Sequence, residues 1–265
     1  MIQPTKLGNT ALLCTLLCTS LFTLLAAPGI LRAADLPAPI EALQAKGVEV
    51  VGTFAAPGGL LGYAGIVQNR PLAMYVTLDR KQVIIGTMLG ANGEDLSQAS
   101  LDKLVSAPMT KKTWTQLDAS NWIGDGAKNA PRIVYTFTDP NCPYCNKFWT
   151  DARPWVKSGK VQLRHVMVGI LRPDSAGKAA ALLSAKDPQR ALLQHEQQHA
   201  NGGGVAAVAQ IAPKVRAQLD ANENLMHELG FSATPTVLYK DGAGHLQTMQ
   251  GAPSKDKLIE ILGPL

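Results

Sequence analysis

Two cysteines stand between a strand-like and a helix-like segment, and this arrangement limits the possible fold more than any other feature. The run RIVYTFT (132–138) has the length and apolar character of a buried strand. A DPN turn follows, and PYCNKFWTDARPWVKSG (143–159) then continues as a helix with an expected kink at Pro154. Cys142 and Cys145 therefore lie where a strand passes into the first turn of a helix.

Strand and helix patterns alternate from residue 129 to the C-terminus, which predicts an α/β domain with a mixed sheet. Three further strands are expected at VQLRHVMVGI (161–170), TPTVLYK (234–240) and HLQTMQG (245–251). Four further helices are expected at AGKAAALLSAKD (176–187), PQRALLQHEQQHA (188–200), PKVRAQLDANENLMHELG (213–230) and PSKDKLIEILG (253–263). Ser254 is placed to cap the last of these helices.

The part before residue 129 divides into two stretches of different character. Residues 35–100 predict a small antiparallel sheet with one leading helix, at LPAPIEALQAKG (36–47). Its strands are expected at VEVVGTFAA (48–56), GYAGIVQN (62–69), LAMYVTL (72–78) and KQVIIGTML (81–89). Residues 101–128 predict a helical linker that is broken at Pro108 and continues through TKKTWTQLDASNWI (110–123). A sheet of this size has a marginal core, which edge pairing with a second copy would complete.

The first 34 residues are typical of a secretory signal peptide. Lys6 is followed by the apolar run ALLCTLLCTSLFTLL (11–25) and then by small residues. The run is short for a membrane span, so cleavage is expected near Ala33 or Ala34, with Ala27 as another candidate. Because two of the 4 cysteines lie in this segment, the exported chain keeps only Cys142 and Cys145.

The charge of the chain argues against a nucleic-acid partner. Removing Lys6 and Arg32 with the signal segment leaves 23 of the 25 basic residues against 20 acidic ones, a net charge of about +3. No run of Lys and Arg forms a basic stripe. We therefore expect no nucleic-acid partner.

The position of the two cysteines predicts redox chemistry. The first amides of a helix lack partners and its dipole places positive charge there, so a thiolate at Cys142 would be stabilised. In CxxC settings this lowers the thiol pKa from about 8.5 to as low as ~3.5–7.5. Pro143 suits the first helical turn, and Cys145, on the same face, can resolve a mixed disulfide formed at Cys142. We expect Cys145 to be the more buried and the less acidic thiol.

Two other interpretations of the cysteine pair are weaker. A disulfide staple closing so short a loop would contribute only about 2 kcal/mol. A zinc site needs four ligands, and no second cysteine pair survives export. We therefore expect no metal, and no cofactor beyond the dithiol itself.

A literal H-E-x-x-H motif at His195–His199 (HEQQH) raises the alternative of a zinc protease. Its two intervening residues are Gln, and ANGGG ends the helix directly afterwards, so we interpret it as a solvated helix end. The glycines at 202–204 are interpreted as a flexible loop.

Other candidate side chains have plain structural interpretations beside functional ones. His165 is more readily a strand-face residue than a proton shuttle, and Asp139 is equally a turn former or an electrostatic tuner of the thiols. Trp149 and Trp155 are more readily core residues than a ligand platform.

These segments together resemble the DsbC/DsbG family of periplasmic thiol:disulfide interchange proteins. The resemblance rests on DLPAPIEALQAKG, FAAPGGLLGYAG, NWIGDGAKNAPRIVYTFTDPNCPYC, ARPWVKSGKVQLR, NENLMHELG and ATPT. The CPYC tetrapeptide, with Pro143 and Tyr144 between the cysteines, makes the chain more similar to the DsbG branch. The segment around HEQQHANGGGVAAVAQ departs from the family pattern.

The resemblance implies a thioredoxin fold with a helical insertion, preceded by a small cystatin-like dimerisation domain and a helical linker. It implies that Cys142 is the nucleophile, that Cys145 is the resolving thiol, and that Thr234-Pro235 forms a cis-proline loop that contacts clients. It also implies a periplasmic homodimer that an inner-membrane reductase of the DsbD type keeps reduced. The implied activities are disulfide isomerisation or reduction, reduction of cysteine sulfenic acids, and chaperone-like holding of clients.

Two alternatives remain open at this point. A disulfide-inserting oxidase of the DsbA type would use the same dithiol, although the amino-terminal domain argues against it. A dimeric periplasmic holdase would bind clients and use its cysteines only secondarily.

Overall fold

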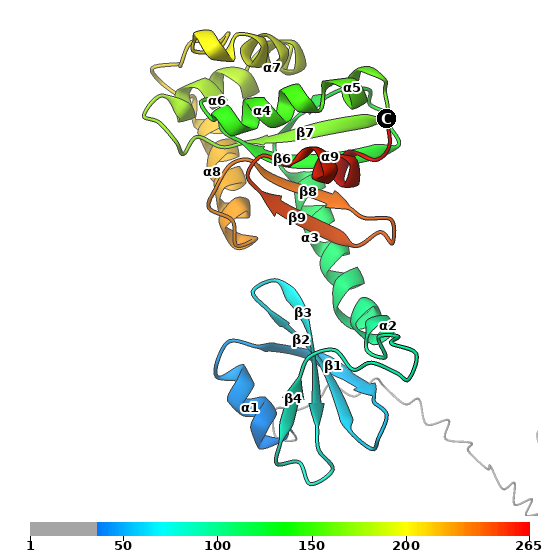
Figure 1. The fold of residues 1–265 in the computed structure, drawn as a ribbon. Helices are drawn as coiled ribbons and strands as arrows, with labels where there is room; N and C mark the ends of the chain where they lie inside the picture. The colour runs from blue at the N-terminus through cyan, green and yellow to red at the C-terminus, as the bar shows by residue number, and fades with distance from the viewer. Residues whose placement is uncertain (1–35) are drawn as a thin grey trace, which may run out of the picture. The chain divides into compact units, whose positions relative to one another are not determined.

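The four-stranded and the five-stranded sheet seen in Figure 1 lie within residues 36–265, the part of the chain that this computed structural model describes. The expected signal peptide, residues 1–34, falls outside the described residues. Within residues 36–265, no helix is both long and apolar enough to cross a membrane.

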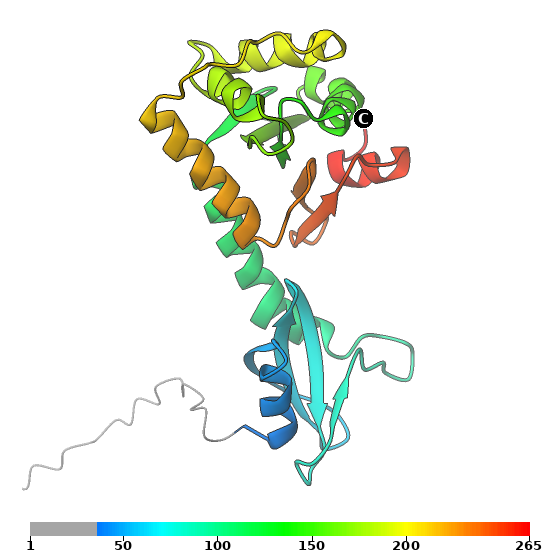
Figure 2. The ribbon, with the colours of Figure 1, turned by 90° about the vertical axis from the view of Figure 1, so that its left-hand side faces the viewer.

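The smaller sheet is antiparallel, with strand order β1-β2-β3-β4. Its strands are β1 (Glu49–Ala55), β2 (Leu61–Val67), β3 (Arg70–Val76) and β4 (Val83–Ile85). Helix α1 (Ala38–Gln44) lies beside this sheet, as Figure 2 shows. Its Ile40 is fully buried. The positions agree with the predicted helix and strands, but β4 is much shorter than the run 81–89 suggests. β4 ends early because Gly86 adopts a positive φ of 141°.

The linker helix differs from its prediction at both the proline and the end. Helix α2 (Gln98–Leu101), the π-helical turn η2 (Asp102–Ser106) and α3 (Ala107–Ala119) follow one another without a break. Pro108 follows the π-helical turn η2 inside this continuous helical run, so the expected break at Pro108 is wrong. The expected helix over 110–123 also ends too late, because β5 (Trp122–Asp125) is a strand that pairs antiparallel with β7 (Val161–Met167).

The larger sheet is mixed, with strand order β5-β7-β6-β8-β9. Strand β6 (Arg132–Thr138) is parallel to β7 and antiparallel to β8 (Thr236–Lys240), which pairs in turn with β9 (Leu246–Gln250). The boundaries of β6 match the predicted run RIVYTFT. Because β6 is central, its carboxyl end carries the cysteine segment out of the middle of the sheet.

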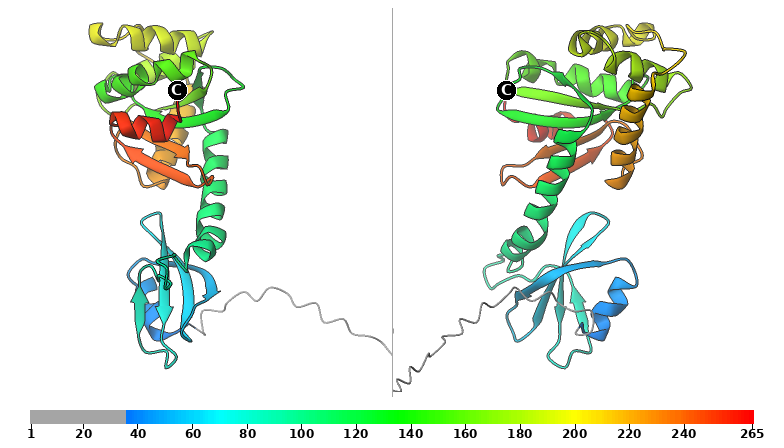
Figure 3. Two further views of the ribbon diagram at one scale, coloured as in Figure 1. Left: turned by 45° about the vertical axis from the view of Figure 1, so that its right-hand side comes forward. Right: turned by 180° about the vertical axis from the view of Figure 1, so that it is seen from behind.

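Helices cover both faces of the larger sheet. On one face, α4 (Pro143–Asp151), α5 (Arg153–Lys157) and α9 (Lys255–Leu262) enclose a core that includes Val134, Phe148 and Val237. The other face carries α3 and α8 (Pro213–Glu228), which the view from behind in Figure 3 shows. Side chains of α3 and of the second half of α8 pack there on Tyr135 and Phe137. The predicted kink at Pro154 is confirmed, because α4 ends at Asp151 and α5 begins at Arg153.

A helical insertion separates β7 from α8. It contains α6 (Ser175–Leu183), α7 (Pro188–Gln197) and the short 3-10 turn η3 (His199–Asn201). Its apolar side chains pack with Ile123 of β5, Met167 of β7 and Leu219 of α8. The insertion is therefore anchored to the five-stranded sheet next to the end of β7.

Candidate active site at the start of helix α4

Cys142 is the N-cap residue of α4, and its sulfur lies among hydrogen-bond donors and acceptors of two segments. The backbone N–H of Cys145 donates to Cys142 Sγ over 3.3 Å. In the thiol form, Cys142 Sγ donates to the carbonyl oxygen of Thr234, also over 3.3 Å. Both cysteines are present as free thiols. The sequence thus places a sulfur where the unpaired amides of the first helical turn meet it.

The two thiols differ strongly in acidity. Hydrogen bonding from the Cys145 thiol, aided by the amides of Cys145 and Tyr144, lowers the pKa of Cys142 to about 6 against the opposing effect of burial. Burial raises the pKa of Cys145 well above its ordinary value, and the neighbouring Cys142 adds to this rise. The predicted order of acidity is confirmed.

Both cysteines are closed to solvent, but burial acts more strongly on Cys145, where it is the largest cause of the pKa shift, as expected. Cys142 is 2% exposed and Cys145 is 3% exposed. Cys142 is covered because the Thr234 carbonyl lies against its sulfur, a contact from a segment 92 residues away that local sequence does not reveal. Between the two cysteines, Pro143 and Tyr144 are both exposed, Tyr144 with 62% of its surface accessible.

The Thr234-Pro235 peptide bond is cis, as predicted, and it directly precedes β8. Since β8 pairs with β6, the loop before β8 comes to the same edge of the sheet as the segment after β6. The structure therefore brings together four of the residues singled out in the sequence: the cysteine pair and the Thr-Pro pair.

Asp139 holds the turn that leads from β6 into the cysteines. Its carboxylate accepts hydrogen bonds from the backbone amides of Asn141 (2.8 Å), Ile170 (2.8 Å) and Leu171 (2.9 Å), and from the Ser175 hydroxyl (2.8 Å). The residue is only 1% exposed. Four donors around one buried carboxylate favour the turn-forming interpretation of Asp139. The carboxylate also joins the turn after β6 to the segment after β7.

Asn141, the residue before Cys142, is fixed by the insertion. Its side-chain amide donates to Asp174 Oδ1 and to Ser175 Oγ, both over 2.9 Å. Its side-chain oxygen accepts from Lys178 Nζ over 2.8 Å, and the same ammonium donates to the Gly202 carbonyl. Nothing in the linear sequence pairs Asn141 with Lys178, so sequence reasoning missed both residues.

Comparison with known proteins shows which family the chain resembles. The family model described as a thioredoxin-like domain matches residues 125–264. Among solved structures, the catalytic domain of Proteus mirabilis ScsC is 22% identical with a TM-score of 0.48, covering 57% of this chain and 93% of that one. The thiol:disulfide interchange protein DsbG of Escherichia coli K12 is 42% identical over 238 residues, 89% of this chain and 95% of the relative. DsbG of Pseudomonas aeruginosa is 51% identical over 242 residues, 91% of this chain and 94% of the relative.

The chain belongs to the DsbG family of thiol:disulfide interchange proteins. This membership confirms the resemblance seen in the sequence, the thioredoxin-type fold of the larger sheet and the predicted enzyme class.

His165 of this DsbG-family protein is a buried residue of β7, as its strand-face interpretation suggests. Its Nδ1 lies 3.0 Å from Thr138 Oγ1, and its Nε2 lies 3.7 Å from Asp125 Oδ2. Asp125 also pairs with Arg153 of α5, whose guanidinium stacks on the Trp149 ring 4.1 Å from its centroid. Although burial opposes the shift, the nearby His165 ring and the hydrogen-bonded Arg153 guanidinium hold the pKa of Asp125 well below its usual range.

The HEQQH motif is not a solvated helix end in this DsbG-family protein, so that interpretation is wrong. His195 is completely buried and Glu196 is 4% exposed, and both contact the active-site segment. His199 is only partly buried, with its ring centroid 6.5 Å from that of His195. Within residues 36–265, no group of three or more His, Cys, Asp or Glu side chains is arranged to hold a metal ion.

The burial of His195 was hidden in the sequence because its partner is a backbone carbonyl, Pro140 O, which carries no sequence signature. The glycines that follow the motif were the available signal. An ideal Cβ on Gly203 would lie 2.1 Å from His195 Cε1, so this loop packs on the ring instead of standing free.

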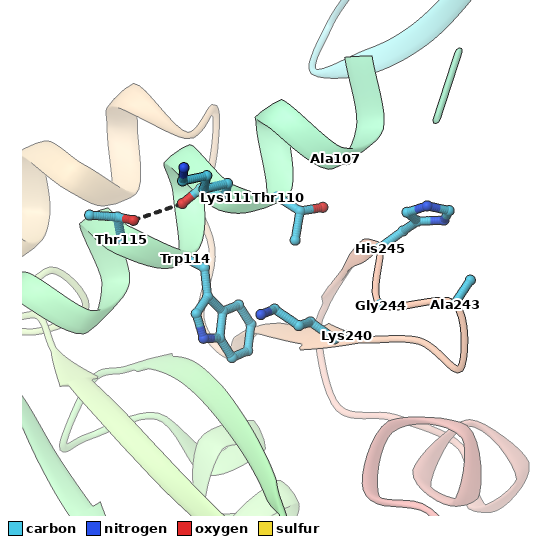
Figure 4. Close-up of a pocket in the computed structure, with 9 residues that line it drawn as sticks. All are labelled: Ala107, Thr110, Lys111, Trp114, Thr115, Lys240, Ala243, Gly244 and His245. Atoms are coloured by element: carbon cyan, nitrogen blue, oxygen red, sulfur yellow. Dashed lines mark hydrogen bonds between the residues drawn. The ribbon is translucent and has the colours of Figure 1, made fainter. Parts of the chain in front are cut away.

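The hollow drawn in Figure 4 is separate from the thiols. It has a volume of about 320 Å³ and lies between α3 and the β8–β9 hairpin, lined by Trp114, Lys240 and His245 among others. Lys240 Nζ lies 4.3 Å from the centroid of the Trp114 ring, and Thr115 Oγ1 donates to the Lys111 carbonyl. None of the residues that line it belongs to the cysteine or Thr-Pro segments, so we do not include it in the active site.

Proposed function

We propose that this DsbG-family protein is a reductive thiol–disulfide oxidoreductase with Cys142 as the nucleophile and Cys145 as the resolving thiol. The supporting observation is the opposite shift of two adjacent thiols, with the pKa of Cys142 lowered to about 6 and that of Cys145 raised. At neutral pH the first thiol is therefore mostly thiolate, while the second keeps its proton until it is needed.

The reaction proceeds through a mixed disulfide. The Cys142 thiolate attacks one sulfur of a client disulfide, the S–S bond breaks, and the departing client sulfur takes up a proton. Cys145 then loses its proton and attacks Cys142 Sγ, which releases the second client thiol and leaves a Cys142–Cys145 disulfide. One client disulfide is reduced and one dithiol is oxidised. If the client's own free thiolate attacks the mixed disulfide first, the same intermediate gives isomerisation.

A client sulfenic acid fits the same two steps. Attack of the Cys142 thiolate on the S–OH sulfur forms the mixed disulfide and expels hydroxide, which leaves as water after protonation. Attack by Cys145 then returns the client cysteine to its thiol. A client with only one cysteine can react in this way, whereas disulfide reduction needs two.

The residues around Cys142 and the partners of the protein are also part of the proposal. The carbonyl of Thr234 lies on Cys142 Sγ, which supports a role for the Thr234-Pro235 loop in placing the client backbone. Pro143 begins the helix and Tyr144 presents an exposed ring to the client side. The dithiol is the only redox group required. We place the protein in the periplasm as a homodimer whose dithiol is restored by a membrane reductase of the DsbD type.

The direction of the reaction separates this proposal from a disulfide-inserting oxidase. A pKa of about 6 lies between those of thioredoxin (~7) and of DsbA (~3.5), so acidity alone does not fix the direction. We base the reductive direction on DsbG-family membership and on the smaller sheet that precedes the larger one. The resting redox state in cells tests this point: the proposal requires mostly dithiol, and a mostly disulfide population would support the oxidase.

Trapping with Cys145→Ser tests the mechanism itself. Without a resolving thiol the mixed disulfide cannot decay by the second step, so clients should remain attached to Cys142 and be released by dithiothreitol. The matched control is the Cys142→Ser/Cys145→Ser double variant, which should trap nothing. Identifying whether each trapped client has one cysteine or several separates sulfenic acids from disulfides. If the single variant traps no client while Cys142 still reacts with iodoacetamide, the mechanism is wrong.

A holdase function is the second candidate, because exposed apolar residues flank the site at Tyr144, Ile170 and Leu171. A Cys142→Ala/Cys145→Ala variant separates the two functions. If this variant protected unfolded clients from aggregation and also gave full rescue of client folding, the holdase would be the main function.

A further inference from the structure

Two adjacent residues of helix α7, His195 and Glu196, are buried although their neighbours Gln194 and Gln197 are exposed. Burial of a histidine and a glutamate is costly unless each finds hydrogen-bond partners. Both find them in the segment that carries the cysteines. We call these two residues the His195–Glu196 clamp.

The clamp contacts the chain on both sides of the CPYC tetrapeptide. His195 Nε2 donates to the carbonyl oxygen of Pro140 over 2.8 Å, two residues before Cys142. The side-chain amide of Asn146, one residue after Cys145, donates to both the Glu196 carbonyl oxygen and Glu196 Oε2 over 2.8 Å. Two adjacent residues of α7 therefore bind both the segment that leads into α4 and the first turn of α4.

These contacts bear on the bonds that stabilise the Cys142 thiolate. The Cys145 amide reaches Cys142 Sγ only if the first turn of α4 keeps its shape, and Asn146 N donates to Cys142 O within that turn. Donors fixed in advance stabilise a charge more than donors that must be ordered when the charge forms. By holding both ends of the first turn of α4, the two clamp residues keep the Cys145 amide in place and so stabilise the Cys142 thiolate.

We propose that the His195–Glu196 clamp is a positioning device of the redox dithiol, through which the helical insertion sets the reactivity of Cys142. His195 and Glu196 touch neither sulfur and act only through Pro140 and Asn146. The proposal rests on Cys142 being the nucleophile and adds the residues that tune it.

One ring nitrogen of His195 makes the contact of the clamp. Since a carbonyl accepts from Nε2, that nitrogen carries a hydrogen, while Nδ1 is buried and has no hydrogen-bond partner. The clamp therefore donates to a backbone carbonyl at one end and accepts from the Asn146 side-chain amide at the other.

The glycine loop after α7 provides a way to move the clamp from outside the active site. Gly202 and Gly203 both have φ of +91°. An added Cβ on Gly203 would overlap the His195 ring at 2.1 Å, whereas an added Cβ on Gly202 would meet no atom within 4 Å. Gly203→Ala and Gly202→Ala thus carry the same backbone cost, and only the first pushes on His195.

The test measures the reaction of Cys142 with iodoacetamide in the reduced, processed protein. Because the pKa of Cys142 is lowered and that of Cys145 is raised, Cys142 is the thiol that reacts. A rise of one unit in the Cys142 pKa from about 6 lowers the thiolate fraction at pH 6 about five-fold. We expect a loss of about this size at pH 6 for His195→Ala, Gly203→Ala and Glu196→Ala, and equal rates for all proteins at pH 9.

Two variants control for other causes of a slower reaction. Gly202→Ala should react like the wild type at pH 6. Glu196→Gln keeps an oxygen that can accept from Asn146, so its rate should stay within about two-fold of the wild type and well above that of Glu196→Ala. A general loss of folding would lower rates at both pH values and would be visible in circular dichroism.

The proposal is overturned if folded Gly203→Ala and His195→Ala react at pH 6 as fast as Gly202→Ala. If neither of these variants folds, the comparison of Glu196→Ala with Glu196→Gln decides, and equal rates would reject the clamp. The readout is thiol ionisation, which needs no client. Failure of the trapping experiment would therefore reject the proposed function and leave the result for the clamp standing.

Discussion

Cys142 and Cys145 lie in one turn of helix α4, yet their surroundings move their thiol pKa values in opposite directions. The largest single cause for Cys142 is the hydrogen bond from the Cys145 thiol, with further help from the Thr234 contact and from backbone amides. Each thiol thus acts on the other: the donor keeps its proton and the acceptor loses it. The asymmetry that the mechanism needs is a property of the pair.

This dependence predicts different effects for two replacements of Cys145. Cys145→Ala removes the donor, so the pKa of Cys142 should rise from about 6 by one unit or more toward its ordinary value. Cys145→Ser keeps a hydroxyl that can donate, so its Cys142 pKa should lie lower than in the alanine variant. Thiolate absorbance at 240 nm against pH measures both. Identical titrations of the two variants would show that the Cys145 side chain is not the cause.

Asp139 illustrates a buried carboxylate used for structure. Asp139→Asn would place an amide group against backbone N–H donors that now share the carboxylate, leaving at least one of them unpaired. We expect a loss of about 2 kcal/mol or more in the free energy of unfolding, measured with urea. Asp220→Asn, at an exposed position of α8, is the control and should change stability by less than about 0.5 kcal/mol. Equal stabilities of the two variants would contradict this account.

At the scale of elements, strand β5 and helix α5 are joined by a pair of charges that also reaches the strand next to the active site. Asp125 of β5 pairs with Arg153 of α5 and lies near His165 of β7. The pair is largely buried, with side chains 10% and 14% exposed. Removing one partner of such a pair leaves an uncompensated charge, which costs more than the pair contributes when intact.

Arg153→Ala should therefore lower the free energy of unfolding by about 3 kcal/mol at pH 7. The pKa of Asp125 is depressed in the folded protein, so its contribution is present above the unfolded carboxyl pKa and is lost as pH falls through the folded value. The difference between wild type and variant should then shrink as pH falls below about 4.

Lys147→Ala is the control for this prediction, because it removes only the solvent-exposed pair with Asp151 and should cost about 0.5 kcal/mol or less. Urea unfolding at pH 7 and at pH 3.5 gives both differences. An Arg153→Ala difference that stays constant over this range would show that Asp125 is not the group responsible.

Local patterns predicted most elements, and the failures have identifiable physical causes. RIVYTFT is a short, mostly apolar run that is followed by a turn, and both boundaries of β6 match it. The sequence assigns Trp122 and Ile123 to the preceding helix, because their strand character comes from pairing with β7, about 40 residues on. The sequence predicts a break at Pro108 because a proline inside a helical pattern removes a backbone hydrogen bond, and local sequence does not show the π-helical turn that precedes it.

In the site, the residues whose chemistry is local were predicted, and those that act across the fold were not. Cys142 and Cys145 follow from spacing and from the strand-to-helix junction. Lys178 and His195 reach the active-site segment through side-chain or carbonyl oxygens of residues far away in sequence, which only the packing of the insertion brings near.

At the scale of the whole molecule, residues 36–265 contain a small sheet whose apolar edge strand has a partner on one side only. β4 pairs only with β3, and Ile84 and Ile85 on it are 54% and 49% exposed. Exposed apolar edges of this kind are normally covered, since they otherwise recruit other chains. A second copy of the chain is the cover that the proposed homodimer supplies.

Ile84→Lys should accordingly weaken the dimer by about ten-fold or more, measured by sedimentation equilibrium, because it places a charge on the covered edge. Ile259→Lys is the matched control, since Ile259 is also 54% exposed but lies on α9 beside the larger sheet. Dimers of equal strength in both variants would remove β4 from the interface.

The contacts of the insertion with Pro140, Asn141 and Asn146 have a consequence for protein engineering. A shortened chain without α6 and α7 would keep the five strands, both cysteines and the Thr-Pro loop, and by its motifs it would still be recognised as a redox domain. It would nevertheless lack the groups that hold the start of α4 from the side. Grafting this dithiol onto a simpler scaffold therefore requires transferring those helices with it, or replacing the hydrogen bonds that they supply.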